Sequence, residues 1–171
     1  MPDFPLVSQN LRIRPFTPED EDKLYAFLSQ TMAARSADEY DSAVDCYIQQ
    51  CRDEATVGAK RRHLTLGVFD VRQDRLMGRF LAKATDTRPD EWALDSIRLK
   101  ERDKHMVELL RTVLPYFEKR LKAQFVVAQT KRQFWKMRDA LEMAGFKPVD
   151  IDEIGYAHYQ KTLKPVTLSI I

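Results

Sequence analysis

Glycine and cysteine are both scarce in this chain: its 171 residues include five glycines and two cysteines. No glycine-rich linker, repeat or low-complexity segment divides the chain. We therefore expect a single domain over residues 1–171, with 1–10 as an N-terminal extension and 164–171 as a C-terminal tail. No window approaches the roughly 18 consecutive apolar residues of a membrane helix. The N-terminus lacks the basic start and apolar stretch of a signal peptide. These absences predict a cytoplasmic protein without a membrane span.

The two cysteines, Cys46 and Cys51, are five residues apart in a segment with a helical pattern. This spacing points them to different sides of a helix, and no histidine is near them in the sequence. We therefore expect neither a zinc site nor a redox pair, but two thiols in a reducing compartment. No other grouping of residues in the chain suggests a metal.

Apolar residues make up 44% of the chain and aromatic residues 10%, which predicts a folded core. The net charge is only +2, but it is unevenly distributed. Residues 18–54 hold ten acids and three bases, whereas residues 98–139 hold five acids and twelve bases. This pattern indicates either two solvated faces of opposite sign or an anion-binding face over Arg98–Arg138. A coenzyme A phosphate, a nucleic acid and an acidic protein remain open as partners of that face.

The first half of the chain begins with a strand and two helices. Residues 11–16 alternate between apolar and basic side chains, as in a strand with one wet face. Thr17 and Pro18, followed by two acids, predict a helix start, and Leu24, Phe27 and Leu28 point inward from that helix. A second helix is predicted from about residue 37 because one apolar stripe recurs at helical spacing. The stripe consists of Tyr40, Ala43, Val44, Tyr47, Ile48 and Cys51.

The second half alternates between period-two and helical patterns. These predict a strand hairpin, a third strand, a helix, a strand, a helix and a closing strand. The elements cover residues 63–71 and 75–84 (hairpin), 91–99 (strand), 106–121 (helix), 125–130 (strand), 132–144 (helix) and 156–163 (strand).

Three features of these elements can be tested directly. Pro115 should kink the helix over residues 106–121 or end its first segment. The nearly all-apolar run over residues 125–130 predicts a strand buried on both faces. In the last helix we expect four residues to point inward, with Gly145 as its left-handed C-terminal residue. The four are Phe134, Met137, Leu141 and Ala144.

Four stretches in this order resemble the GCN5-related N-acetyltransferase (GNAT) superfamily, over roughly residues 11–163. They are LRIRPFTPEDEDKLYAFL, EWALDSIRLKE, ALEMAGF and YAHYQKTL, which begin at residues 11, 91, 140 and 156. The first is similar to the opening strand and helix of the branch that acetylates ribosomal-protein N-termini. The resemblance implies an α/β (α+β) fold, with a central mixed, mostly antiparallel sheet flanked by helices on both faces.

The resemblance also implies a loop after the central strand that binds the pyrophosphate of acetyl-CoA. The family loop reads Arg or Gln, two residues, Gly, one residue, then Gly or Ala, because main-chain N–H groups must close around the phosphates. With Arg102 as its leading residue, the two small positions become His105 and Val107, and neighbouring registers contain no glycine either. If acetyl-CoA binds, the cofactor-binding residues are Leu99, Arg102, Lys104 and His105.

The groups that would move protons are also implied only by the resemblance. A general base could be Glu91 or Asp95 on the central strand, although a solvent-facing polar group is the plainer interpretation of Asp95. The family tyrosine that protonates the departing thiolate falls at Leu141, which has no proton to give. His105 could pair with a phosphate or be a solvated helix N-terminal residue, and His63 and His158 are interpreted as structural.

Three hypotheses follow. The first is a degenerate GNAT scaffold with a binding or structural role, a protein partner and no cofactor, which could be virion-associated in a phage. The second is an active acyl-CoA-dependent N-acetyltransferase with an atypical loop, acting on a protein or small-molecule amine. Nucleic-acid binding is the weakest, because Arg98–Arg138 lacks a recognised groove-reading motif. We favour the first hypothesis because of what the loop lacks.

Overall fold

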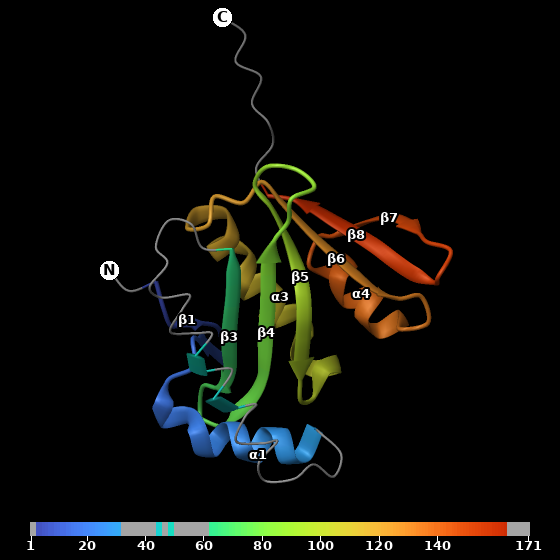
Figure 1. Ribbon diagram of the computed structural model, residues 1–171. Coiled ribbons are helices and arrows are strands. Elements are labelled where there is room, and N and C mark those ends of the chain that lie inside the picture. The colour runs from blue at the N-terminus through green and yellow to red at the C-terminus, as the bar shows by residue number, and fades with distance from the viewer. Residues whose placement is uncertain (1–2, 32–43, 46–47, 50–61, 164–171) are drawn as a thin grey trace, which may run out of the picture. The chain divides into compact units, whose positions relative to one another are not determined.

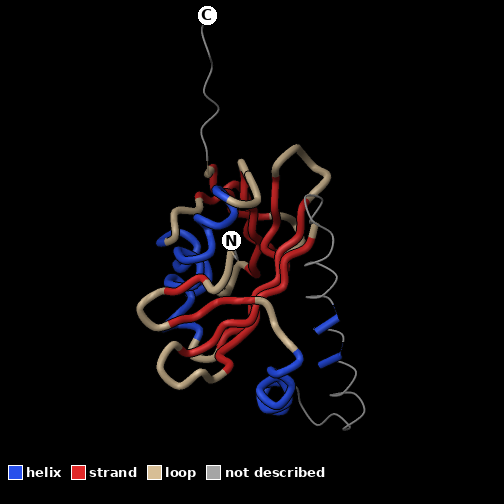
Figure 2. Tube along the Cα trace, turned by 90° about the vertical axis from the view of Figure 1, so that its left-hand side faces the viewer, coloured by secondary structure: helices blue, strands red, loops and turns tan. Residues whose placement is uncertain are grey.

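The computed structural model describes residues 3–31, 44–45, 48–49 and 62–163. Its eight strands form one sheet in the order β1-β2-β3-β4-β5-β6-β8-β7 (Figures 1 and 2). The pair β5–β6 is parallel, and β1–β2, β2–β3, β6–β8 and β7–β8 are antiparallel. The prediction of a mixed, mostly antiparallel sheet is therefore confirmed. Among the described helices, none is long and apolar enough to cross a membrane.

The chain divides into two compact units, which are described separately below. Unit 1 comprises Met1–Ala82 with Ser96–Lys100, and unit 2 comprises Lys83–Asp95 with Glu101–Ile171. That the whole chain folds as a single domain stays a prediction.

Unit 1 contains the N-terminal strands and the first helix. Its elements are β1 (Leu6–Val7), β2 (Leu11–Arg14), the short 3₁₀ helix η1 (Pro18–Asp20), α1 (Glu21–Thr31), β3 (His63–Asp70), most of β4 (Leu76–Ala84) and the end of β5 (Glu91–Leu99). The inward residues predicted for the first helix, Leu24, Phe27 and Leu28, are buried in one apolar cluster with Phe16 and Phe69. Burial of such an amphipathic face supplies most of the stability of a short helix.

The second predicted helix is described only in part. Residues 44–45 and 48–49 are helical, and Val44 and Ile48 are buried as the stripe predicts. The other members of the stripe (Tyr40, Ala43, Tyr47, Cys51) and Cys46 lie outside the described residues.

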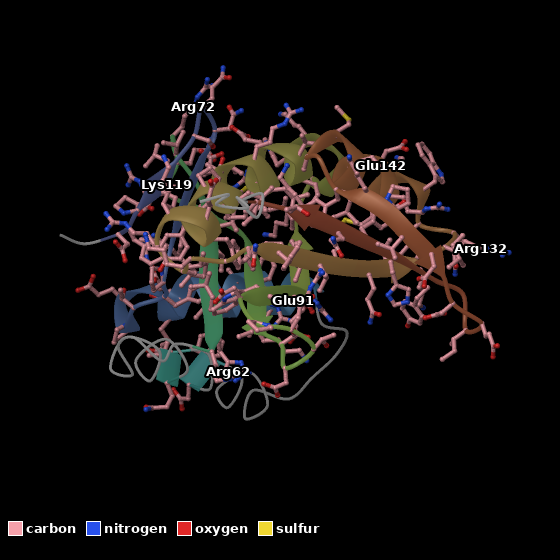
Figure 3. All side chains as sticks on the ribbon, turned by 90° about the horizontal axis from the view of Figure 1, so that it is seen from above. Arg62, Arg72, Glu91, Lys119, Arg132 and Glu142 are labelled. Carbon is pink, nitrogen blue, oxygen red and sulfur yellow. The ribbon has the colours of Figure 1, made fainter. Side chains whose placement is uncertain are left out.

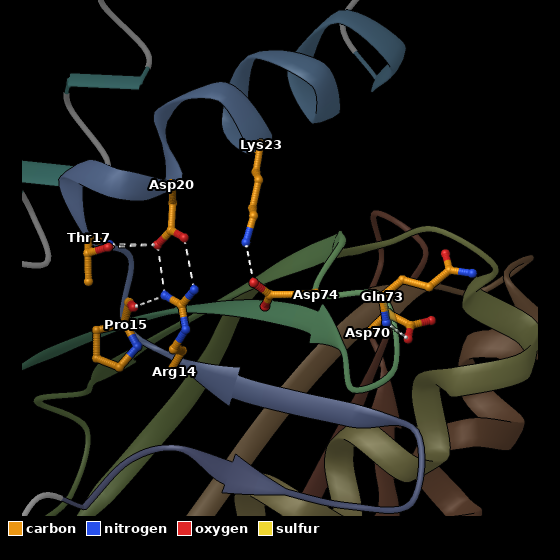
Figure 4. Close-up of polar contacts among 8 residues, drawn as sticks. All are labelled: Arg14, Pro15, Thr17, Asp20, Lys23, Asp70, Gln73 and Asp74. Carbon is orange, nitrogen blue, oxygen red and sulfur yellow. Dashed lines mark hydrogen bonds and ion pairs between the residues drawn. The ribbon is translucent and has the colours of Figure 1, made fainter.

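The start of the first helix is confirmed and is tied to strand β2 by charge. Thr17 is the N-cap of η1, and its backbone N–H donates to Asp20 at 2.8 Å. The two terminal nitrogens of the Arg14 guanidinium, Nη1 and Nη2, each donate to one oxygen of Asp20 at 2.8 Å (Figure 4). Asp20 is 2% exposed. Burial opposes its ionisation, but the hydrogen bonds from Arg14 and Thr17 and the Arg14 charge outweigh burial and lower the Asp20 pKa.

Unit 2 contains the beginning of β5 and all later elements. These are α3 (Arg102–Lys119), β6 (Phe125–Lys131), α4 (Trp135–Met143), β7 (Lys147–Ile151) and β8 (Tyr156–Thr162). Helix α3 covers the predicted helix over residues 106–121 up to Lys119, and it buries Met106, Leu109 and Val113. It runs through Pro115 without ending, so of the two effects expected of Pro115 the end of a segment is wrong, and the kink stays a prediction. Pro115 lies on the exposed side of the helix.

Helix α4 is shorter than predicted, which changes the position of Phe134. Phe134 is the N-cap residue, ahead of the first helical turn, so the helical period does not place it inward. Its side chain is 45% exposed, and the prediction that it points inward is wrong. The end of α4 is as predicted: Gly145 has φ +97°, and Phe146 N–H donates to the Leu141 carbonyl at 3.0 Å. This is the hydrogen-bond pattern of a Schellman C-cap.

Candidate functional site

Unit 2 contains a cleft of about 800 Å³ that residues of β5, β6 and β8 line. Strands β5 and β6 pair over only three residues, from Glu91↔Phe125 to Ala93↔Val127. Leu94 and Asp95 on β5 and Ala128 and Gln129 on β6 follow that pairing and line the cleft. The charged and titratable side chains that could take part in binding or proton transfer are Lys83, Arg88, Glu91, Asp95, Asp150, Asp152 and His158.

Strand β6 has one buried face, so the prediction that it is buried on both faces is wrong. Val126, Ala128 and Thr130 are buried, whereas Gln129 is exposed and Val127 is half-buried. Val127 and Gln129 line the cleft. The apolar run in the sequence therefore does not indicate burial on both faces, because Val127 lies beside the exposed Gln129 on the side that lines the cleft.

Glu91, a predicted general base, is held in a closed network (Figure 3 labels it on β5). Thr85 Oγ1 donates to one carboxylate oxygen at 2.7 Å, and Arg88 Nε donates to the other at 2.5 Å. Arg88 also donates to Gln160 at 2.7 Å and stacks over the ring of Phe125 at 3.6 Å. Since both Glu91 oxygens are engaged and Glu91 is only 6% exposed, the arrangement suits a structural anchor better than a base.

Asp95, the other predicted base, lies open in the cleft. Its side chain is 48% exposed and forms an ion pair with Lys83 at 3.5 Å. An exposed pair of this length contributes little to stability, so Asp95 and Lys83 are both available to a ligand.

The cleft also contains an acid–base pair, Asp152 and His158, that the sequence did not reveal. His158 Nε2 lies 2.8 Å from Asp152 Oδ2, and both residues line the cleft. The backbone N–H groups of Tyr156 and Ile154 donate to the other Asp152 oxygen at 2.9 and 3.0 Å. The hydrogen bond from Tyr156, followed by that from His158, lowers the Asp152 pKa. The sequence showed no partner for His158, and in the structure that partner is Asp152.

The β7–β8 hairpin creates this pair by bringing residues six apart in the chain together. Asp152 begins a four-residue turn that Gly155 closes with φ +97°, and Gly155 N–H donates to the Asp152 carbonyl at 3.1 Å. A D-x-x-G turn followed by a polar residue three positions later is the sequence signal that could have found it.

A second candidate region is the turn that joins β5 to α3. Strand β5 ends at Leu99 and helix α3 begins at Arg102, so only Lys100 and Glu101 connect them. Glu101 has φ +52°, in the left-handed region, and its carbonyl accepts hydrogen bonds from Lys104 N–H at 2.9 Å and His105 N–H at 3.3 Å. The connection is therefore a tight turn that leads directly into the helix.

Comparisons with known proteins bear on both regions. No protein-family model matches the chain, and no curated protein matches it. The structure is similar to that of the ribosomal-protein-S5-alanine acetyltransferase from Vibrio fischeri, with a TM-score of 0.74 over 95% of this chain and 100% of that chain, at 11% identity. A GNAT-family acetyltransferase from Bacillus anthracis gives a TM-score of 0.67 over 94% and 99%, also at 11% identity. The protein has the GNAT fold.

A third GNAT-fold neighbour shows which cofactor the fold accommodates elsewhere. The ribosomal L7/L12 alpha-N-protein acetyltransferase, in a complex with coenzyme A, gives a TM-score of 0.70 at 10% identity, over 91% of this chain and 96% of that chain. At these identities the similarity establishes the GNAT fold and leaves the chemistry to the residues themselves.

The residues at the β5–α3 turn do not fit the diphosphate of acetyl-CoA. A diphosphate needs free main-chain N–H groups at the start of the helix, with small residues where the main chain approaches it most closely. Here the turn has two residues, both with side chains. The small positions that the GNAT loop requires are occupied by His105, which is buried, and Val107 inside α3. Acidic Glu101 and Asp103 add negative charge at the helix start.

The residues predicted to bind the cofactor are distributed as follows. Lys104 is exposed, Leu99 is half-buried, and the side chain of Arg102 lies outside what the structure describes. The side chain of His105 is 8% exposed, with Glu101 and Glu108 each 3.5 Å from one of its ring nitrogens. His105 is therefore not the solvated residue of the plainer interpretation. Leu141, at the position of the family acid, is buried as well.

Replacing Glu101 with glycine should stabilise the protein by about 1 kcal/mol, because a side chain in the left-handed region is strained by roughly that amount. Urea unfolding followed by circular dichroism measures the change. Lys104→Gly is the matched control: it places glycine in the regular helix a turn later and should destabilise by about 1 kcal/mol. Equal destabilisation by both variants would show that Glu101 is not strained.

Proposed function

We propose that this chain is a GNAT-fold binding protein that does not use acetyl-CoA and that docks onto a protein partner. The two-residue β5–α3 turn, with Glu101 in the left-handed region, is the observation that carries the proposal. Binding energy from the diphosphate is what positions the thioester in an acyl transfer, so loss of its cradle removes the basis of the reaction.

A protein partner is the class that the fold favours. The neighbour from Vibrio fischeri is named for ribosomal protein S5, and another neighbour for ribosomal L7/L12. Under this proposal the chain retains the cleft as a binding surface and does not catalyse acyl transfer. A setting in a phage particle stays a prediction, as do the cytoplasmic location and an anionic ligand at Arg98–Arg138.

Titration calorimetry with acetyl-CoA tests the proposal. We expect no binding heat and no rise in melting temperature at 1 mM ligand, a concentration chosen to be about a thousandfold above a micromolar dissociation constant. The L7/L12 acetyltransferase, which forms a complex with coenzyme A, is the positive control run in the same buffer. A dissociation constant near 1 µM for this chain would overturn the proposal.

The alternative function is an active acyl-CoA-dependent N-acetyltransferase with an atypical loop. The open position of Asp95 in the cleft favours it, because a base must reach the attacking amine. An active enzyme would lose turnover on Asp95→Ala while keeping its melting temperature. Absence of any turnover in the unmodified protein would exclude this alternative.

A further inference from the structure

Two neighbouring turns form one end of unit 2. The turn between β6 and α4 comprises Arg132–Phe134, and the turn between β7 and β8 comprises Asp152–Gly155. They are joined directly, because the backbone N–H of Arg132 donates to the carbonyl of Gly155 at 2.8 Å (Figure 1 shows both turns at the same end). Lys131–Lys136 and Asp152–Gly155 together are named the tip below.

The tip exposes three large apolar side chains. Phe134 is 45%, Trp135 62% and Ile154 85% exposed. Phe134 and Trp135 stand at the start of α4, ahead of its buried residues Ala140 and Leu141, so neither ring is needed to pack the helix. Single exposed apolar residues are ordinary on a protein surface, but three of them on two adjoining turns mark a surface that contacts an apolar phase or partner.

Positive charge accompanies these apolar side chains. Residues 131–136 read KRQFWK, all six are exposed, and they include three cations and no acid. The ammonium of Lys131 lies 5.7 Å from the centre of the Phe134 ring, and that of Lys136 lies 5.6 Å from the centre of the Trp135 ring. Each exposed ring therefore has a cation beside it. The interface of an anionic bilayer favours this combination, with aromatic rings at headgroup level and Lys or Arg among the headgroup charges.

We propose that the tip binds the surface of a membrane that contains anionic lipids. The three apolar side chains enter the headgroup region, and the cations of residues 131–136 pair with the lipid headgroups. A bilayer accommodates apolar side chains from two separate turns without a matching pocket for each, which a protein partner would have to provide. Ile154 argues against single-stranded nucleic acid, because an aliphatic side chain offers no ring on which a base can stack. This inference goes beyond the proposed function and does not depend on it.

The acids of the tip are Asp152 and Glu153. Asp152 is engaged within the hairpin: its carboxylate accepts hydrogen bonds from the N–H groups of Ile154 and Tyr156 and lies 2.8 Å from Nε2 of His158. Glu153 is exposed next to Ile154. Its charge opposes an approach to anionic headgroups, so removal of that charge should strengthen binding.

Tryptophan fluorescence tests the proposal, because one of the two tryptophans, Trp135, is 62% exposed and the other, Trp92, only 5%. Vesicles of phosphatidylcholine with about 30% phosphatidylserine should shift the emission of the full chain to shorter wavelength, and vesicles of phosphatidylcholine alone should bind at least tenfold more weakly. In Trp135→Phe the shift should disappear while the protein still sediments with the vesicles. No shift, or equal binding to both kinds of vesicle, would overturn the proposal. A shift with oligothymidylate and none with vesicles would reject it in favour of nucleic acid.

Exposed apolar residues at the two ends of α4 give a matched pair of variants. Phe134→Ser combined with Trp135→Ser should lower the partition coefficient about tenfold in vesicle sedimentation. Serine is a favoured N-cap residue, so the helix start should persist. Met143→Ser should leave the partition coefficient unchanged, because Met143 is 60% exposed but lies at the other end of α4, two turns away. Equal losses in the two proteins would overturn the proposal.

Two charge variants should act in opposite directions. Arg132→Gln should weaken binding to phosphatidylserine vesicles about fivefold, and Glu153→Gln should strengthen it about fivefold. Both side chains are exposed, so the far-ultraviolet circular dichroism of both variants should match that of the unmodified protein. Changes of the same sign, or no change in either variant, would show that the tip does not face the headgroups.

Discussion

Alanine at position 78 should destabilise the protein by about 3 kcal/mol, which is the upper end of the range for overpacked cores. A Cβ at Gly78 would lie 2.1 Å from the carbonyl oxygen of Arg98 and 2.9 Å from the Cα of Leu99. Both contacts are to backbone, so no side-chain rotation relieves them and the strands themselves must move. Lys100 N–H donates to the Met77 carbonyl at 2.8 Å beside this contact, and that hydrogen bond should weaken as well.

Gly155→Ala is the control for this substitution. A Cβ at Gly155 meets no atom within 4 Å, but its φ of +97° strains any side chain. The control therefore measures the backbone cost alone, about 1 kcal/mol. Urea unfolding gives both values on one scale. If Gly78→Ala lowers the free energy of unfolding by no more than Gly155→Ala does, the backbones of β4 and β5 do not approach each other as closely at Gly78 as the structure indicates.

The sequence predicted best those elements that a turn residue or a strong period delimits. Strand β5 has the predicted bounds, 91–99, because a loop with Pro89 precedes it and a run of charge follows it. Gly145 ends α4 as predicted, since its conformation is one that other residues avoid. Both predictions rest on local chemistry, which the sequence carries directly.

Strands whose residues make no period were missed. All five residues of β7 are exposed, and they include Pro148 and Asp150, which strands disfavour. The strand exists because it pairs with β8, with a register shift between Pro148 and Asp150. The two-residue strand β1 likewise exists only through its pairing with β2. Such elements are fixed by tertiary contacts that no local pattern encodes.

The features of the candidate site also divide into those that the sequence could predict and those that it could not. The lack of glycine at the β5–α3 turn could be predicted from the sequence because it depends only on which residue types are present. The states of Glu91, Asp95 and His158 could not, since they depend on partners: Arg88 engages Glu91, Asp95 stays open, and Asp152 orients His158. Protein-specific chemistry in the cleft is set by these pairings, while the fold is shared with proteins only 10–17% identical.

The second large effect is expected at the buried ion pair of unit 1. Arg14→Ala should destabilise the protein by about 3 kcal/mol, because it leaves the Asp20 carboxylate buried without its bidentate partner. The Arg14 guanidinium also lies over the Phe69 ring at 4.0 Å, so the substitution removes a cation–π contact as well. Lys23→Ala is the control. It removes a pair with Asp74 that is 2.7 Å long but exposed, and should cost no more than about 1 kcal/mol (Figure 4).

The pH dependence distinguishes lost charge pairing from lost packing. The pKa of Asp20 is lower in the folded protein than in the unfolded chain, where aspartate titrates near 4. The stability due to the pair is therefore fully present above about pH 5, and it is lost as the pH falls through the folded value. In Arg14→Ala, a protonated Asp20 no longer needs a partner. The difference in the free energy of unfolding between the unmodified protein and Arg14→Ala, measured with urea, should therefore become smaller from pH 5 to pH 3. A difference that stays constant over that range would assign the effect to the contact with Phe69 and not to the charge of Asp20.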